Sequence, residues 1–396
     1  MKKVVVLQHR LLHYRVPLFE LLRENCRKDG IDLVLVHGQA SEIEKSRMDE
    51  GKLDWAIRVQ NHYWRVAGKD ILWQPFPDRA KGASLVIVMQ ENRILSNYLL
   101  LVKRLFGGPL VGYWGHGRNF QSVAPDGLRE RWKSFLLTRI DWWFTYTDIS
   151  VDHITRHGYP REKITNLENA IDVSGFQHEL TSVTDEELRN MCRELSLPEH
   201  ARVGVYCGSL YAEKRVDLII ESADQIRSAV PDFHCIVIGD GPSAGEIRAA
   251  VATRPWIHCV GVKKGHAKAI LFRLAHVQLN PGAVGLHVLD AFSAGLPMIT
   301  ISPALHGPEI SYLLNEVNGI ITPTDDAEAY AKAVIRVLTD DAYRSAMQAR
   351  CLADAQHYTV ENMVHNFCEG ILRCLEFYGL RPALTDKETA TSQQLS

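Results

Sequence analysis

The residues of this chain best suited to chemistry follow short apolar runs, and the first group combines a glycine with two cations. Gly208 and Ser209 come directly after the run at 203–207, and Lys214 and Arg215 stand at the start of the next helical pattern. Amide groups at a helix start are free to donate hydrogen bonds, and two cations beside them add positive charge. This group predicts a phosphate site, with a solvated Lys-Arg pair as the alternative.

The stretch NPGAVGLHVLDAFSAGLPMITI, which begins at residue 280, holds a second group. Gly282 and Gly285 expose backbone N–H groups in front of a predicted helix at 287–294, where a negatively charged ligand would be favoured. Asp290 lies inside that helix between apolar neighbours, and a carboxylate in such a place needs partners. The vicinal hydroxyls of a ribose would supply two donors. A cap or an internal salt bridge is the alternative.

Three further residues follow predicted strands. Gly241, in GDGPSAGE, would bring the backbone close to a ligand or form a plain turn. Val262, in VGVK, would pack against the face of a flat ligand ring or would be part of a turn. Glu309 would stand at the start of a helix near the same site, or would be an ordinary first-turn glutamate that the helix dipole favours.

The amino-terminal half carries two groups of basic residues at strand ends. His116 follows a strand in the sequence WGHG. A neutral imidazole suits contact with hydroxyls and an imidazolium suits a developing charge, while a structural loop histidine is the alternative. The first strand runs into HRLLHYRVP, which gathers His9, Arg10, His13 and Arg15 in one loop.

The elements that would position these residues alternate between strand and helix. Short runs rich in Val, Ile and aromatic residues are separated by segments with helical periodicity, such as 17–26 and 128–140. This pattern predicts an α/β protein with parallel, doubly wound sheets, whose ligands bind beyond the carboxyl ends of the strands. The predicted strands are 4–7, 33–36, 85–89, 110–114, 142–146 and 164–167 in the first half, and 203–207, 235–238, 257–259, 277–279 and 298–301 in the second.

Two Rossmann-like domains facing a cleft are predicted, because the alternation stops in a polar, acidic stretch and then restarts. The terminal helix could cross back to the first domain, and the tail after it lacks periodicity. The predicted parts are a first domain at 1–172, a linker with a short helix at 173–200, a second domain at 201–358, a terminal helix at 359–380 and a disordered tail at 381–396.

Composition and charge narrow the class of protein. Apolar residues make up 46% of the 396 and charged residues 23%, and no apolar run reaches the roughly 18–20 residues that span a bilayer. MKKVVVLQHR reads as a first strand rather than a signal peptide, and eight scattered cysteines indicate reduced thiols in a cytoplasmic protein. Residues 1–172 hold 26 Lys and Arg against 20 Asp and Glu, which favours an anionic partner on that side, with chance asymmetry as the alternative.

The motifs resemble those of the retaining glycosyltransferases of family 4, which have the two-domain GT-B fold. The resemblance covers most of the chain and is strongest at 203–322. GSLYAEKRVD at 208–217 is similar to the family's Gly-Arg-Leu…Lys-Gly phosphate motif, and VIGDGP at 237–242 to its Gly-x-Gly-Pro turn. GLHVLDAFSAGLP at 285–297 is similar to Gly-Leu…Leu-Glu-Ala-Met-Ala-x-Gly-x-Pro, and ENAID at 168–172 to the Asn-Gly-Ile-Asp that closes the amino-terminal domain.

The resemblance implies roles for several residues and shows where the chain departs from the pattern. Asp290 would hold the ribose, in the role of the second glutamate of the family's Glu-x7-Glu pair. The first glutamate of that pair, which contacts the donor sugar, is replaced here by Gly282, and Glu309 could take over its role. Ser209 replaces an arginine, so phosphate binding would depend on Lys214 and Arg215.

Other positions follow from the same resemblance. Gly285 and Leu286 match the family's Gly-Leu in the donor site. His116 matches a histidine that contacts the donor sugar. The loop with His9, Arg10 and Arg15 lies where the family has the acceptor side of the cleft.

The resemblance implies a retaining glycosyltransferase. It would move a sugar from a nucleotide-diphosphate donor, with UDP-hexose or UDP-N-acetylhexosamine expected first and a GDP sugar second, to a glycan or lipid-linked acceptor of bacterial surface polysaccharide. No Asp-x-Asp occurs, so no metal or other cofactor is expected, and cations and amides would stabilise the leaving diphosphate. No nucleic-acid partner is expected. A sugar-nucleotide epimerase of related fold and a non-catalytic protein that binds sugar nucleotides are the alternatives.

The segment 127–143 predicts contact with a membrane. Its apolar residues fall at helical spacing with basic residues largely between them, as in helices that lie on anionic lipid. Packing of the stripe on the first sheet is the alternative. The apolar residues are Leu128, Trp132, Phe135, Leu136 and Trp143, and the basic ones are Arg129, Arg131, Lys133 and Arg139.

Overall fold

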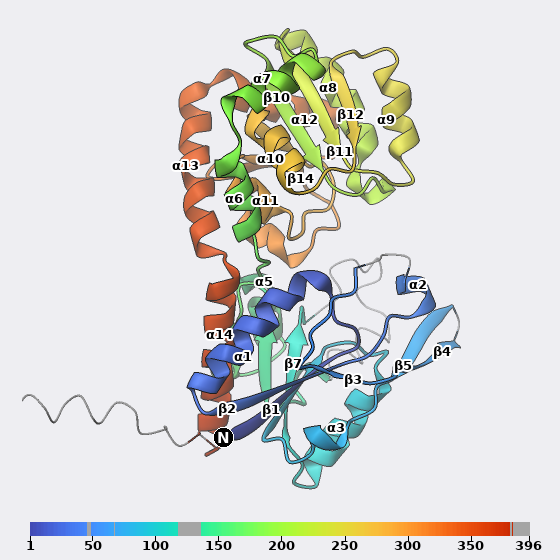
Figure 1. The fold of residues 1–396 in the computed structure, drawn as a ribbon, viewed down its shortest axis with the longest axis vertical. Coiled ribbons are helices and arrows are strands. Elements are labelled where there is room, and N and C mark those ends of the chain that lie inside the picture. Colours follow the sequence, from blue (N-terminus) through green and yellow to red (C-terminus); the bar gives the residue numbers. More distant parts are fainter. Residues whose placement is uncertain (46–48, 67, 118–135, 381, 383–396) are drawn as a thin grey trace, which may run out of the picture. The chain divides into compact units, whose positions relative to one another are not determined.

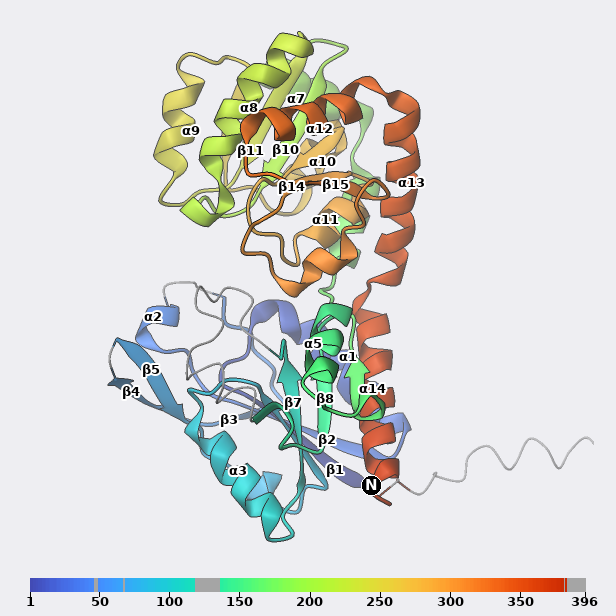
Figure 2. The ribbon, with the colours of Figure 1, turned by 180° about the vertical axis from the view of Figure 1, so that it is seen from behind.

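The structure of the chain is a computed structural model of residues 1–396. It describes all residues except 46–48, 67, 118–135, 381 and 383–396. The chain folds as two compact units, of which the first combines Met1–Ile171 with Val360–Ser396 and the second is Asp172–Thr359. Both appear in Figures 1 and 2.

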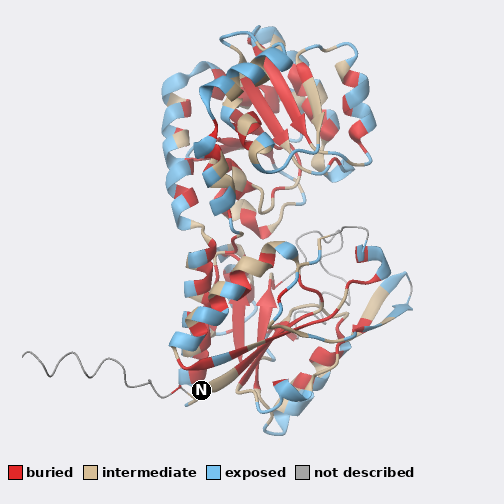
Figure 3. Ribbon diagram, in the orientation of Figure 1, coloured by how far each residue is buried: buried red, intermediate tan, exposed pale blue. Residues whose placement is uncertain are grey.

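The first unit contains a seven-stranded parallel sheet, in the order β3-β2-β1-β6-β7-β8-β9. Its central strands are continuous runs of Val, Ile and Leu without an exposed face, which is the pattern of a parallel sheet covered on both sides (Figure 3). The strands are β1 (Lys2–Gln8), β2 (Ile31–His37), β3 (Ile57–Arg58), β6 (Leu85–Met89), β7 (Leu110–Gly115), β8 (Trp142–Thr145) and β9 (Ile164–Asn166).

Helices and a small hairpin complete the first unit. α14 (Val360–Phe377) lies beside α1 (Val16–Lys28) and contacts β8 and β9, so the end of the described chain packs on the first sheet (Figures 1 and 2). β4 (His62–Val66) and β5 (Lys69–Trp73) form an antiparallel pair. Among the described residues of this unit, the remaining α-helices are α2 (Glu42–Lys45), α3 (Leu95–Leu105) and α5 (Asp148–Arg156).

The second unit contains a six-stranded parallel sheet in the order β12-β11-β10-β13-β14-β15. Its helices are α6 (Ser174–Ser182), α7 (Asp185–Glu194), α8 (Val216–Ala229), α9 (Ala244–Val251), α10 (Gly265–Leu274), α11 (Val288–Ser293), α12 (Ala327–Thr339) and α13 (Asp341–His357). The strands are β10 (Arg202–Cys207), β11 (Phe233–Ile238), β12 (Ile257–Gly261), β13 (Val277–Leu279), β14 (Met298–Ile301) and β15 (Gly319–Thr322).

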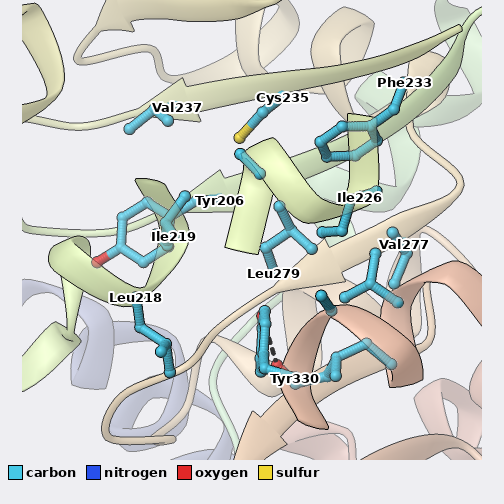
Figure 4. Close-up of a cluster of buried hydrophobic side chains, with 14 of the residues drawn as sticks. Tyr206, Leu218, Ile219, Ile226, Phe233, Cys235, Val237, Val277, Leu279 and Tyr330 are labelled. Carbon is cyan, nitrogen blue, oxygen red and sulfur yellow. Dashed lines mark hydrogen bonds between the residues drawn. The ribbon is translucent and has the colours of Figure 1, made fainter. Parts of the chain in front are cut away.

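One core of the second unit lies between its sheet and the helices α8 and α12. Figure 4 shows Ile219 and Ile226 of α8 and Tyr330 of α12 against the strand residues Phe233 and Leu279. The buried Tyr330 hydroxyl donates to the carbonyl of Ile299 at 3.1 Å, so this polar group is satisfied inside the core.

The two doubly wound sheets confirm the predicted fold class, but the predicted linker is wrong. Residues 173–200 contain α6 and α7, and the second begins in a capping box between Thr184 and Glu187. Leu180 and Val183 are buried in a cluster with Phe272 of α10. The polar residues that suggested a linker form the exposed faces of helices whose apolar positions belong to the second unit.

The predicted amphipathic segment at 127–143 lies mostly outside the described residues. Its described end contradicts one helix over the whole segment, because Trp143 is on β8 and fully buried. Among the helices that the structure describes, none is both long and apolar enough to cross a membrane.

Candidate functional site

In the second unit the strand order reverses between β10 and β13, which is where ligands of open parallel sheets bind. The loops after these two strands are hydrogen-bonded to each other. The N–H of Ala283 donates to the carbonyl of Glu213 at 3.2 Å, and Lys214 Nζ donates to the carbonyl of Ala283 at 2.5 Å. The first and second predicted groups therefore form one site.

Gly282 is required where these loops meet. A Cβ at this position would lie 2.4 Å from the carbonyl oxygen of Glu213 and 2.5 Å from Lys214 Cα, which is far inside van der Waals contact. No other residue fits without moving one loop. The absence of a glutamate at 282 is therefore a consequence of how closely the two loops pack.

Gly241 has the same kind of role on the other side of β10. A Cβ there would lie 2.5 Å from the carbonyl oxygen of Leu210, and Leu210 N–H donates to the carbonyl of Asp240 at 3.0 Å. Gly208 and Ser209 belong to the loop that this contact fixes, and the carbonyl of Ser209 accepts from the Tyr206 hydroxyl.

The two cations of the first group differ in their surroundings. Burial lowers the pKa of the Lys214 ammonium, which donates a hydrogen bond to the backbone carbonyl of Ala283. Arg215 has a left-handed backbone and pairs with Asp217 and Asp325, and these hydrogen bonds raise its pKa further. Its charge is already balanced by two carboxylates, so Lys214 is the better-placed cation for an anionic ligand.

Backbone donors complete the site. Among the described residues, the N–H groups of Gly285, Leu286 and His287 donate to no protein acceptor. A Cβ on Gly285 would meet open space apart from one ring atom 4.0 Å away. Three free amides in front of α11 can bind phosphate oxygens.

A network of neutral side chains holds this backbone from behind. His287 Nε2 lies 3.0 Å from Asn280 Oδ1, and the Asn280 amide donates to the carbonyl of Gly282. Burial, followed by the charges of Lys214 and Lys268, lowers the pKa of His287 to about 3. Since Asn280 Oδ1 can only accept, the neutral His287 carries its proton on Nε2.

Asp290, on α11, has a partner that the sequence did not indicate. Lys268 Nζ of α10 lies 2.8 Å from its carboxylate and 4.1 Å from the centre of the Phe176 ring of α6. The internal salt bridge considered as an alternative is therefore present, and a ribose would have to share Asp290 with Lys268. A lone lysine in a helix gave no signal that could have found this contact.

The remaining predicted residues of this unit lie near the same strand ends. Glu309 is buried in the short helix Pro308–Tyr312, and its Oε2 lies 2.7 Å from where a Cβ of Gly307 would be. The Gly307 N–H donates to the carbonyl of Val284. Val262, just after β12, is 61% exposed and available to a flat ring.

In the first unit the strand order reverses between β1 and β6, and charged side chains meet there. His9 Nε2 lies 3.2 Å from Glu44 Oε1 and 3.1 Å from the Arg93 guanidinium, and His9 Nδ1 lies 3.4 Å from Glu91. Burial opposes ionisation of Glu44, but hydrogen bonds from His9 and from the Ser41 amide hold its pKa well below the usual range. Glu91 and Arg93 were not singled out from the sequence, because they lie in an ordinary polar turn.

Arg10 and Arg15 are less accessible than an acceptor-binding role requires. Arg10 is 6% exposed and pairs with Asp49. Arg15 is 5% exposed, and it donates to Asn169 Oδ1 at 2.6 Å and to the carbonyl of Ala170. The prediction that Arg15 faces the acceptor is wrong, because this side chain ties the ENAID segment to the start of α1.

His116 lies just beyond β7, with its ring centre 4.3 Å from that of Tyr146. Burial, followed by the charge of Arg15, lowers its pKa to about 4, so the ring is neutral at pH 7. The next residue, Gly117, is held by Gln90 through both its N–H and its carbonyl. A neutral, fixed imidazole is the form suited to hydroxyl contact.

Nothing in this arrangement gathers metal ligands. In the part of the chain that the structure describes, no three His, Cys, Asp or Glu side chains come together in a group that could hold a metal ion. Metal independence stays a prediction.

Comparison with solved structures places this geometry in a known fold. A protein from Anabaena, Alr3699/HepE, solved in complex with UDP, superposes with a TM-score of 0.65 at 12% identity over 94% of this chain and 99% of that one. A glycosyltransferase from Rickettsia africae superposes with a TM-score of 0.67 at 12% identity over 95% and 99%. The fold is that of the GT-B glycosyltransferases.

Sequence comparison of the second unit agrees with the fold found by structural comparison. Residues 201–340 match the family described as glycosyl transferases group 1. Two curated relatives are D-inositol 3-phosphate glycosyltransferases, from Salinispora tropica at 28% identity over 173 residues and from Corynebacterium urealyticum at 23% over 238. The matches cover 40% and 56% of this chain, and 35% and 54% of the relatives.

Proposed function

We propose that the protein is a retaining glycosyltransferase of family 4 that transfers a hexose or N-acetylhexosamine from a UDP sugar to a glycan or lipid-linked acceptor. The observation that carries the proposal is the joining of Lys214, Gly282 and the free amides after Gly285 at one switch point. A nucleoside diphosphate needs a cation and several fixed donors, and this site offers both. The UDP complex of the Anabaena protein favours uridine over guanosine.

In the proposed mechanism the second unit stabilises the leaving diphosphate. Lys214 Nζ keeps two protons beyond the one given to Ala283, and the amides of 285–287 add neutral donors. These groups do not reorganise as charge develops on the phosphate oxygens, so they stabilise the transition state more than the ground state. Lys214 and the amides would thus do what a metal does elsewhere, without a cofactor.

The sugar and the acceptor are assigned to the remaining residues. Neutral His116 would accept a hydrogen bond from a sugar hydroxyl or donate one to it. Asp290 would accept hydrogen bonds from the ribose hydroxyls. The acceptor hydroxyl would attack the anomeric carbon from the face that the diphosphate leaves and would pass its proton to the leaving diphosphate, with His9 and its charged neighbours on the acceptor side. Attack on that face retains the anomeric configuration without a carboxylate nucleophile.

An epimerase acting on a sugar nucleotide is the second candidate, because a protein from Listeria monocytogenes described as a UDP-N-acetylglucosamine 2-epimerase also superposes, with a TM-score of 0.61 at 11% identity. Incubation with UDP-N-acetylglucosamine and no acceptor separates the two. Accumulation of the epimer would overturn the transferase proposal. Binding of UDP sugars without any turnover would favour a non-catalytic binding protein.

The test of the phosphate site compares two lysines. Lys214→Ala should weaken UDP binding and lower turnover by about tenfold or more, which corresponds to about 1.4 kcal/mol. Lys332→Ala, at an exposed position on α12, is the matched control and should change neither. Equal binding of UDP by wild type and Lys214→Ala in calorimetry would remove the phosphate assignment.

We further propose that the protein works at the surface of an anionic cytoplasmic membrane. A lipid-linked acceptor has to be met there, and the first half of the sequence has an excess of positive charge.

A further inference from the structure

A histidine in the loop after β14 is hydrogen-bonded to the backbone beside the proposed phosphate site. His306 Nδ1 lies 3.1 Å from the N–H of Val284, and His306 Nε2 lies 2.9 Å from the carbonyl oxygen of Ile301. A carbonyl can only accept, so the ring carries its proton on Nε2 and accepts from Val284 through Nδ1. Burial lowers the pKa of His306, and so does the charge of Lys214, so the ring is neutral at pH 7 and keeps this tautomer.

One peptide group connects His306 to Lys214. The peptide that joins Ala283 to Val284 donates its N–H to His306 Nδ1. The carbonyl oxygen of the same peptide accepts from Lys214 Nζ at 2.5 Å. Because a peptide bond is planar and trans, its N–H and its carbonyl point in opposite directions. This peptide is therefore held from both sides, and His306 fixes the plane of the carbonyl to which Lys214 is bonded.

The next peptide group is held by the residue that follows His306. The carbonyl of Val284 accepts from the N–H of Gly307 at 2.7 Å. This carbonyl belongs to the peptide that carries the N–H of Gly285, the first of the three free amides, so the same planarity fixes the direction of that amide. The loop after β14 thus supports both kinds of donor in the proposed site.

We infer that His306 is a positioning residue of the proposed diphosphate site and that it acts on Lys214 through the peptide of Ala283 and Val284. The row of hydrogen bonds begins at the carbonyl of Ile301, the buried last residue of β14, so the ammonium is held in register with the sheet. Hydrogen bonds in such a row polarise one another, which makes the Ala283 carbonyl a better acceptor for Lys214. In this role His306 acts without contact with the ligand. The inference rests on the proposed function.

Two substitutions of His306 separate its two hydrogen bonds. In His306→Asn the amide oxygen takes the place of Nδ1 and can still accept from Val284. In His306→Gln the amide nitrogen takes the place of Nε2 and can donate to Ile301, which leaves the Val284 N–H without its acceptor. UDP affinity in calorimetry should fall about tenfold in His306→Gln and stay within about twofold of wild type in His306→Asn. The same change at an exposed histidine, His200→Gln, is the matched control and should bind UDP like wild type.

A double variant tests whether His306 acts through Lys214. Lys214→Ala removes the group on which His306 is inferred to act. Adding His306→Gln to Lys214→Ala should therefore weaken UDP binding by no more than about twofold further, because the two changes affect one interaction. A further loss of about tenfold in the double variant would overturn the inference, since His306 would then act on the ligand independently of Lys214.

Hydrogen exchange without ligand distinguishes failure of this inference from failure of the proposed function. The Val284 N–H should exchange about tenfold faster in His306→Gln than in wild type or His306→Asn. Wild-type UDP affinity in His306→Gln, or equal losses of affinity in the two variants, would overturn the inference and leave the proposed function standing. A wild type that does not bind UDP, but shows the expected exchange, would remove the proposed function and retain His306 as the residue that holds this backbone.

Discussion

Lys268 Nζ and a carboxylate oxygen of Asp290 are 2.8 Å apart, and both side chains are more than four-fifths shielded from solvent. The pair joins α10 to α11. The carboxylate proposed to hold a ribose is thus fixed in place by a neighbouring cation. The pair can be separated experimentally into its contributions to stability and to binding.

For this pair we expect each single variant to be less stable than the double variant. Lys268→Met should cost about 2 kcal/mol of unfolding free energy, because it leaves a shielded carboxylate without its partner, whereas Lys268→Met with Asp290→Asn should recover most of that loss. UDP affinity should fall about tenfold in both variants that lose the Asp290 carboxylate. Urea unfolding and calorimetry with UDP measure the two effects. Full UDP affinity in the Asp290→Asn single variant would remove Asp290 from the ribose site.

Gly282 and Gly285 provide a matched pair for the contact between the two loops. Gly282→Ala should destabilise the protein by about 1–3 kcal/mol and weaken UDP binding, because its Cβ overlaps the backbone of Glu213 and Lys214. Gly285→Ala has open space for its Cβ and should be nearly neutral in stability. Denaturant unfolding of both variants is the measurement. Equal stability of Gly282→Ala and Gly285→Ala would show that the loops after β10 and β13 separate easily.

The sequence predicted much of the fold, since continuous Val and Ile runs can be buried on both faces only in parallel sheets. It failed at α6 and α7, where Leu180 and Val183 are too few against a polar background to suggest packing. It also failed for Arg15, because the groups that Arg15 binds are more than 150 residues away in the chain. The glycine that replaced an expected glutamate could be noticed in the sequence, but its cause needed the position of Glu213.

The histidine network should make the second unit sensitive to acid. His287 has a pKa of about 3 in the folded chain against about 6.5 when unfolded, so between these values the unfolded state binds more protons. Stability should therefore fall as pH is lowered through about 6.5, by about 2 kcal/mol at pH 5 from this residue. His287→Gln keeps a donor toward Asn280 and should make stability depend less on pH.

Urea midpoints at several pH values between 7 and 5 measure this effect. His200→Gln, at an exposed position in the same unit, is the control and should retain the wild-type slope. An identical slope for wild type and His287→Gln would show that His287 is not the group responsible.

Glu309 is the residue proposed to replace the missing first glutamate, and its burial makes the choice of variant important. Glu309→Gln preserves the shape of the side chain beside Gly307, whereas Glu309→Ala would add a cavity. If Glu309 contacts the donor sugar, Glu309→Gln should keep UDP affinity within about twofold and lower turnover of the UDP sugar by about tenfold. Calorimetry with UDP and with a UDP sugar is read alongside the thermal midpoint, which should stay near that of wild type. Equal losses of affinity for both ligands would place Glu309 in the support of the 284–285 backbone and leave the sugar without this carboxylate.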